Sequence, residues 1–264
     1  MKMAASAWKM RRSASRDGVP RPGARGPRQR GTRVPLTRPY FADDRVTLYL
    51  GDCREVTEWL SADVLITDPP YGINYSTGYG GQFTGSKIAG DADETLRDTV
   101  LTVWGDRPAV VFASFKQRPY GRPHPMPLIF DKGEDIGMGD LSWPWRPSYE
   151  LAWVYGQGWA GKRRGAVLRY RVLPGNFTHR DHPTQKPVAL FEDIITKAPP
   201  GIIADPFAGS GSTLLAARNL GRRAIGVELD ERYAELAAKR LCQGVLEFPA
   251  QEADARGSGG LECR

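Results

Sequence analysis

The stretch IIADPFAGSGST at residues 202–213 joins a short apolar run to a turn that contains two glycines. The apolar run at 202–204 is predicted to be a buried strand, and the residues after 213 have the apolar spacing of a helix. A second short strand at 224–227 follows that helix and stops at an acid, Glu228. Strand, glycine-rich turn, helix, strand and acid form the nucleotide-binding half of a doubly wound sheet. The sequence therefore predicts an α/β fold with a Rossmann-like, mostly parallel sheet.

The composition of the glycine turn favours a nucleoside over a phosphate group. A dinucleotide site requires a third glycine in the helix, where this chain has Leu214, and a P-loop requires a lysine where Ser212 follows Gly211. Glu228 is then expected to accept both hydroxyls of a ribose. S-adenosylmethionine, a nucleoside with an amino-acid tail, is the predicted cofactor. A nicotinamide oxidoreductase is the alternative, and it lacks the third glycine that it would need.

A second stretch, Asp68-Pro69-Pro70-Tyr71, follows the apolar run at residues 64–67. Two prolines in series fix φ, remove two backbone donors and make the tetrapeptide a stiff extended corner. The Asp68 carboxylate and the proline-flanked carbonyls are acceptors suited to a planar group with an exocyclic amine, and Tyr71 is suited to stack on that plane. A rigid strand-to-loop turn without chemistry is the alternative reading.

The remaining chain alternates between predicted strands and helices. Two strands without a helix between them, at 128–130 and 149–154, predict an antiparallel pair at the sheet edge. The glycine-rich residues 72–90 are predicted to form a long mobile loop that closes over substrate. The other predicted strands are at 46–50, 64–67 and 109–113, and the predicted helices lie at 56–60, 91–104, 187 to about 199, 214–220 and 230–241.

Charge is concentrated at the start of the chain. The 264 residues carry a net charge of +7, but residues 1–40 hold eleven Lys or Arg and one acid, which is +10. We expect a disordered basic tail over 1–40, a folded domain over 41–243, and a disordered tail over 244–264. A nucleic-acid-binding arm, a solubility tail, a misassigned start and a transit peptide are the open readings of the basic tail.

Other compositional features predict a soluble, cytoplasmic protein. The chain has no apolar run long enough to span a membrane, and its start lacks the apolar core of a secretory signal. Its three cysteines have no metal-ligand spacing, so neither a metal site nor a disulfide framework is expected.

A second basic region, residues 156–181, lies inside the folded part and mixes cations with aromatic residues. That mixture is typical of contacts with phosphates and bases, and a solvated surface hairpin is the alternative. The predicted DNA contacts are Lys162, Arg163, Arg164, Arg169 and Arg171.

Four motifs stand in a fixed order along the chain: DPPY at 68–71, HPTQKP at 182–187, DPFAGSGST at 205–213 and GVE at 226–228. Together they resemble the β-group amino-methyltransferases of DNA, in the circularly permuted motif order of that group, over Arg45 to Cys242. The resemblance implies a methyltransferase domain over 41–243, with residues 156–181 as a short target-recognition insert.

The resemblance also implies roles for individual residues. Asp68, Pro69, Pro70 and Tyr71 would be catalytic, and Asp68 would also border the cofactor. Glu228 would hold the ribose of S-adenosylmethionine. The other residues implied to line the cofactor are Asp52, Cys53, Thr184, Lys186, Asp205, Phe207, Gly209, Ser210, Gly211 and Thr213.

The function implied is a site-specific DNA methyltransferase that acts on the N6 amine of an adenine flipped out of double-stranded DNA. Relatives with Asp before Pro-Pro-Tyr mostly act on adenine, which is the reason for choosing N6 over the alternative, N4 of cytosine. A non-catalytic nucleic-acid-binding relative is the alternative of a different class. A homodimer and a cognate restriction endonuclease are partners compatible with this function.

Overall fold

The structure is a computed structural model that describes residues 38–71, 95–121, 125–133, 142, 144–170 and 185–243. Several predictions fall outside these residues: the loop at 72–90, Arg171, Thr184, the tail from 244 and all of the basic tail before Arg38. The division of the chain into domains therefore stays a prediction.

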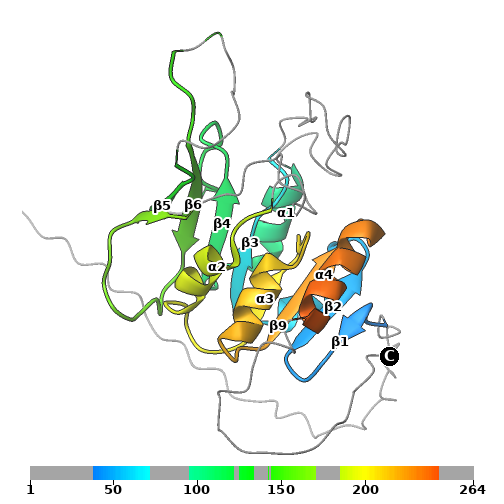
Figure 1. The fold of residues 1–264 in the computed structure, drawn as a ribbon. Helices are drawn as coiled ribbons and strands as arrows, with labels where there is room; N and C mark the ends of the chain where they lie inside the picture. Colours follow the sequence, from blue (N-terminus) through cyan, green and yellow to red (C-terminus); the bar gives the residue numbers. More distant parts are fainter. Residues whose placement is uncertain are drawn as a thin grey trace, which may run out of the picture. The chain divides into compact units, whose positions relative to one another are not determined.

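The described residues form one sheet of nine strands, in the order β1-β2-β9-β8-β3-β4-β6-β5-β7 (Figure 1). The strands β2, β9, β8, β3 and β4 run parallel, β1 is antiparallel to β2, and β6 is antiparallel to both β4 and β5. The strands span Phe41–Ala42 (β1), Val46–Leu50 (β2), Val64–Thr67 (β3), Ala109–Ala113 (β4), Met126–Asp131 (β5), Tyr149–Tyr155 (β6), Val167–Arg169 (β7), Ile203–Asp205 (β8) and Ala224–Glu228 (β9).

Parallel pairing brings the C-terminal ends of the five central strands to one edge of the sheet, which we call the carboxyl edge. Because β6 runs the other way, it begins at this same edge, with Leu151 paired to Ala113 at the end of β4. In a doubly wound sheet, ligands bind at this edge.

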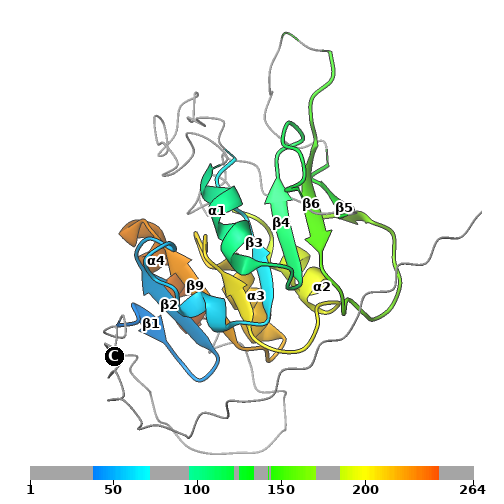
Figure 2. The ribbon, with the colours of Figure 1, turned by 180° about the vertical axis from the view of Figure 1, so that it is seen from behind.

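Helices cover both faces of the sheet. The helices α2 (Val188–Ile195), α3 (Ser212–Asn219) and α4 (Glu231–Gln243) lie on the face seen in Figure 1. The other face carries α1 (Thr95–Trp104), which is in front in Figure 2, and the 3-10 helix Glu58–Ser61. Each face has its own apolar core.

Aromatic pairs mark the two cores. Phe112 of β4 meets Phe191 of α2 edge-on at 5.4 Å between ring centroids. On the other face, Trp59 of the 3-10 helix stacks on Trp104 of α1 at 5.8 Å. Such pairs add about 0.5–1.5 kcal/mol each beyond the burial of their area.

The predicted strands are confirmed, including the antiparallel pair β5 and β6. The strands β1 and β7 were not predicted, because two and three residues are too few for an alternating pattern. In the described part of the chain, no helix has the length and apolarity needed to cross a membrane.

Two helix predictions need correction. The segment at 56–60 forms a single 3-10 turn, with Leu60 N donating to Thr57 O at 2.9 Å, because β3 begins soon afterwards at Val64. The helix predicted at 214–220 ends at Asn219, so Leu220 lies just beyond α3 and is 39% exposed. Gly221 caps the end of α3, with a φ of +69° and a hydrogen bond from its backbone N to Arg218 O at 2.8 Å.

Candidate functional site

The acids predicted to carry function meet at the carboxyl edge. Asp68 follows β3, Asp205 ends β8 and Glu228 ends β9, and these strands are parallel. Asp52 follows β2, whose Leu50 pairs with Glu228. The described residues contain no cluster of three or more His, Cys, Asp or Glu side chains arranged for a metal ion.

The glycine turn between β8 and α3 is fastened to Glu228. Gly209 N donates to Oε2 of Glu228 at 2.7 Å, and Asp230 N donates to Oε1 at 2.8 Å. Each carboxylate oxygen thus accepts one backbone N–H and keeps a further lone pair. Burial raises the pKa of Glu228 above its usual value.

The turn requires glycine at its last position. Gly211 has a φ of +78°, and a Cβ on it would lie 2.9 Å from Cβ of Ala237 in α4. Arg240, also in α4, donates to Ser210 O at 2.5 Å and to Ser210 Oγ at 3.0 Å. Helix α4 therefore holds the turn from behind.

Asp205 joins the two motif-bearing strands. Thr67 Oγ1 in β3 donates to Oδ1 of Asp205 at 2.7 Å, and Phe207 N donates to the same oxygen at 3.1 Å. Thr213, which was also predicted to line the cofactor, is a further hydrogen-bond partner of Asp205. Burial raises the pKa of Asp205 from 3.8 to about 6.

Asp52 and Cys53 lie beside the end of β9, since Gly51 N donates to Glu228 O at 2.8 Å. The Asp52 carboxylate is paired with the Arg54 guanidinium. Cys53 is buried, and burial raises the pKa of its thiol to about 12. A thiol in that state is not a nucleophile.

The Asp68–Tyr71 corner is held by the loop that follows β4. Gln117 Nε2 donates to Tyr71 O at 2.9 Å, and Ser114 N donates to Gln117 Oε1 at 3.0 Å. Pro69 at the centre of the corner is buried. The corner is therefore positioned by its neighbours as well as by its prolines.

Asp68 has two close partners. Its Oδ1 accepts a hydrogen bond from the Tyr71 hydroxyl at 2.8 Å, and its Oδ2 forms an ion pair with the Lys186 ammonium. Lys186 is buried, and its backbone carbonyl accepts from Ser212 Oγ at 3.0 Å. The contacts of Lys186 thus connect the corner to the start of α3.

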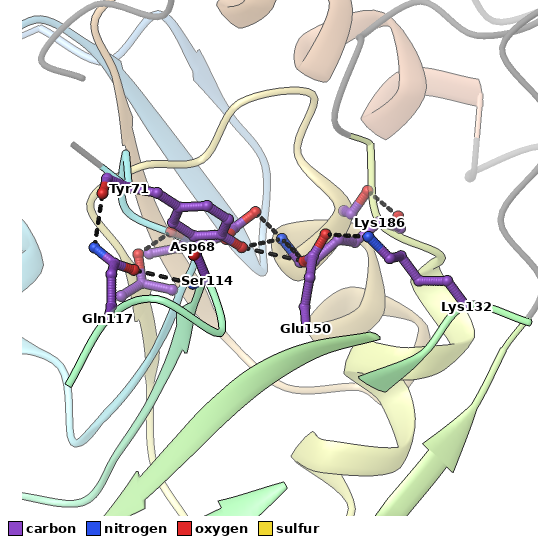
Figure 3. Close-up of polar contacts among 10 residues, drawn as sticks. Asp68, Tyr71, Ser114, Gln117, Lys132, Glu150 and Lys186 are labelled. Atoms are coloured by element: carbon purple, nitrogen blue, oxygen red, sulfur yellow. Dashed lines mark hydrogen bonds and ion pairs between the residues drawn. The ribbon is translucent and has the colours of Figure 1, made fainter. Parts of the chain in front are cut away.

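The structure adds two residues that the sequence prediction missed, Glu150 and Lys132. Glu150 Oε2 lies 3.1 Å from both the Tyr71 hydroxyl and the Lys186 Nζ, and its Oε1 lies 3.1 Å from Lys132 Nζ. Figure 3 shows the two ammonium groups on either side of Glu150. The sequence did contain a signal for Glu150. It is a lone acid at the start of an apolar strand predicted to be antiparallel, and such a strand begins at the carboxyl edge, where the site lies.

Burial and charge set the ionisation of this cluster. Burial raises the pKa of Asp68 despite the Lys186 charge. Burial and the nearby Asp68 and Glu150 carboxylates raise the pKa of Tyr71 well above its usual value. Burial opposes the charge on Lys186, but Asp68 and Glu150 outweigh it, so the pKa of Lys186 is raised. Lys186 is therefore an ammonium, 4.7 Å from the centroid of the Phe112 ring.

The predicted DNA contacts are not all brought together. Arg169 ends β7 at the carboxyl edge, is exposed and donates to Asp131 Oδ2 at 2.8 Å. The segment before β7, with Lys162, Arg163 and Arg164, lies beside the C-terminal end of α2, where Ala160 N donates to Lys197 O at 2.9 Å. Lys186 precedes the other end of α2, so these three cations lie away from Asp68.

Comparisons of the sequence with known proteins point to DNA methylation. A family model described as DNA methylase matches residues 142–239. YubD, a methylase-like protein of Escherichia coli (strain K12), is 30% identical over 210 residues, which are 72% of this chain and 88% of YubD. The type II methyltransferase M.HpaI of Haemophilus parainfluenzae is 26% identical over 231 residues, 69% of this chain and 68% of the relative.

Solved structures share the fold. The complex of M1.HpyAVI with S-adenosylmethionine is 24% identical and has a TM-score of 0.50. The match covers 74% of this chain and 99% of the M1.HpyAVI chain. The cytosine-N4-specific PvuII DNA methyltransferase is 15% identical and has a TM-score of 0.53. The match covers 83% of this chain and 91% of the PvuII methyltransferase chain. The predicted Rossmann-like fold is confirmed.

The buried Asp205 carboxylate predicts a specific dependence of stability on pH. Because its folded pKa of about 6 is above the usual 3.8, the cost of burying the bare charge is full above pH 6 and disappears as pH falls. Asp205→Asn keeps an oxygen to accept from Thr67 and Phe207 and carries no charge. The difference in unfolding free energy, variant minus wild type, should therefore fall by about 2 kcal/mol between pH 7.5 and pH 4.5.

Urea unfolding of both proteins at the two pH values measures this difference. Asp106→Asn, at an exposed position, is the matched control for the same chemical change. An equal difference at both pH values for Asp205→Asn would mean that burial does not raise the pKa of Asp205.

Proposed function

Because the chain belongs to the N6/N4 family of DNA methylases, we propose that it transfers a methyl group from S-adenosylmethionine to the N6 amine of an adenine in DNA. The observation that carries the proposal is the position of Asp68. Asp68 lies on a rigid corner at the carboxyl edge, directly after β3, and the neighbouring strand β8 leads into the glycine turn. A group that grips an amine and a site for a nucleoside are thus neighbours.

The residues around the glycine turn fit a positively charged nucleoside. Asp205 and Glu228 are acids, and no lysine follows Gly211, so a phosphate would be repelled and a cation attracted. Both Glu228 oxygens keep a lone pair for a ribose hydroxyl. M1.HpyAVI, which has the same fold, was solved with S-adenosylmethionine bound.

When bound, S-adenosylmethionine supplies a methyl group on a positively charged sulfur, which becomes a neutral thioether as the nitrogen–carbon bond forms. Asp68 and the Pro69 carbonyl accept hydrogen bonds from the amine of the flipped base and orient its lone pair. Asp68, whose pKa is raised by burial, then accepts the proton that the methylated nitrogen loses. Cys53, with its thiol pKa of about 12, takes no part as a nucleophile.

Two alternatives remain to be tested against this proposal. The N4 amine of cytosine is also conjugated to its ring, and the corner would grip it in the same way. A non-catalytic DNA-binding relative would not need Asp68, Tyr71 and Lys186 in mutual contact, yet all three are. The cytoplasmic location, a homodimer and a companion endonuclease stay predictions.

Asp68→Ala should reduce methyl transfer by about a thousandfold or more, because the amine loses its acceptor. Cofactor affinity, measured by calorimetry, should survive, because the proposed ribose ligand Glu228 lies on a different strand. Asp106→Ala is a surface control for the same chemical change. If cofactor affinity fell together with the rate, Asp68 would be mainly a cofactor ligand.

The modified base is identified by digesting methylated DNA to nucleosides and weighing them. We expect N6-methyladenosine as its deoxynucleoside, because an aspartate in the first position of the corner is mostly found in relatives that act on adenine. N4-methylcytosine as the sole product would overturn the choice of base and leave the role of Asp68 untouched.

A further inference from the structure

Two carboxylates of the charged cluster face the same two donors. The Tyr71 hydroxyl lies 2.8 Å from Asp68 Oδ1 and 3.1 Å from Glu150 Oε2. The Lys186 ammonium pairs with Asp68 Oδ2 and lies 3.1 Å from the same Glu150 oxygen. Glu150 is therefore a second acceptor for each donor that Asp68 now holds (Figure 3).

This sharing bears on what Asp68 has to do in the proposed reaction. Both of its oxygens are engaged, one by a hydroxyl and one by an ammonium. A substrate amine is a weaker donor than an ammonium, so it competes poorly for a carboxylate that a cation holds alone. A second carboxylate beside Lys186, that of Glu150, weakens the interaction of the Lys186 ammonium with Asp68.

Glu150 is built to remain an anion. Lys132 Nζ lies 3.1 Å from its other oxygen, and the pairing of Glu150 with Phe130 in β5 fixes its backbone. Burial opposes its charge, but Lys186 and Lys132 outweigh burial and bring the pKa of Glu150 to about 2. The pKa of Asp68 moves the opposite way, so the two carboxyl groups are suited to different tasks.

We propose that Glu150 is a positioning residue for methyl transfer: it holds the Lys186 ammonium and the Tyr71 hydroxyl while Asp68 accepts hydrogen bonds from the substrate amine. This inference rests on the proposed function. Glu150 itself does not touch the reacting atoms in this account and acts through its two donors.

Among the residues that the structure describes, the charged and titratable groups that face Asp68 are Lys186, Tyr71, Glu150 and, from β8, Asp205. Among these, the negative charge of Glu150 raises the pKa of Asp68. When that charge is removed, Asp68 is the one of the two carboxylates that still pairs with the Lys186 ammonium. The pKa of Asp68 should then fall, and Asp68 should become a poorer acceptor for the amine and its proton.

Glu150→Gln tests this, because it removes the charge and keeps the shape. Single-turnover transfer from methyl-labelled S-adenosylmethionine to DNA from a methylation-deficient bacterial strain is measured between pH 5 and 9. We expect the rate to fall about tenfold or more, with cofactor affinity within about twofold of wild type. The midpoint of the acidic limb should move down by about half a pH unit or more.

Glu192→Gln, on α2 and outside the cluster, is the matched control and should leave rate and midpoint unchanged. A purely structural role for Glu150 would lower the rate equally at every pH. An unchanged midpoint or a wild-type rate for Glu150→Gln therefore overturns the inference. A wild type that methylates no DNA overturns the proposed function, and the inference with it.

If Glu150→Gln does not fold, Glu150→Asp decides the matter. This variant keeps the charge but is one methylene shorter, so it cannot reach both donors. We expect the midpoint of the acidic limb to stay at the wild-type value and the rate to fall about fivefold or more, with cofactor affinity within about twofold of wild type, whereas a structural defect would lower cofactor affinity as well. A wild-type rate in Glu150→Asp overturns the inference.

Discussion

The candidate site depends on one buried cation, the Lys186 ammonium between Asp68 and Glu150. A buried charge is costly unless opposite charges and hydrogen bonds compensate it, and here two carboxylates and the Tyr71 hydroxyl do so. These partners come from the end of β3 and the start of β6, and Lys186 itself comes from the residues before α2. Lys132 pairs with the second carboxylate, so two cations and two anions lie together; Lys186 is buried, and the side chains of Lys132, Glu150 and Asp68 are 21%, 21% and 24% exposed.

The order of the motifs in the chain hides how close they are in the fold. Thr67 and Asp205 are 138 residues apart in sequence, yet their side chains form a hydrogen bond of 2.7 Å between neighbouring strands. One step along the chain from Thr67, Asp68 begins the corner proposed to hold the base. Asp205 begins the turn proposed to hold the cofactor. The Thr67–Asp205 bond thus fixes the distance between the two halves of the site.

The motifs and central strands could be predicted because glycine, proline and apolar alternation act locally. Glu150 could not be assigned a role, because its side chain faces Lys186 only in the observed register of β6, and a shift of one residue would turn it to the other face. The basic run before and within β7 looked continuous in sequence. The unpredicted strand β7 separates Arg169, at the carboxyl edge, from Lys162 at its other end.

In the proposed function, the acidic glycine turn and the Asp68 corner together transfer a methyl group to DNA. Incubating the wild-type protein with methyl-labelled S-adenosylmethionine and unmethylated DNA tests it most directly. We expect label to enter the DNA and to stop at a plateau set by the number of target amines. A folded protein that binds S-adenosylmethionine but leaves such DNA unlabelled would contradict it.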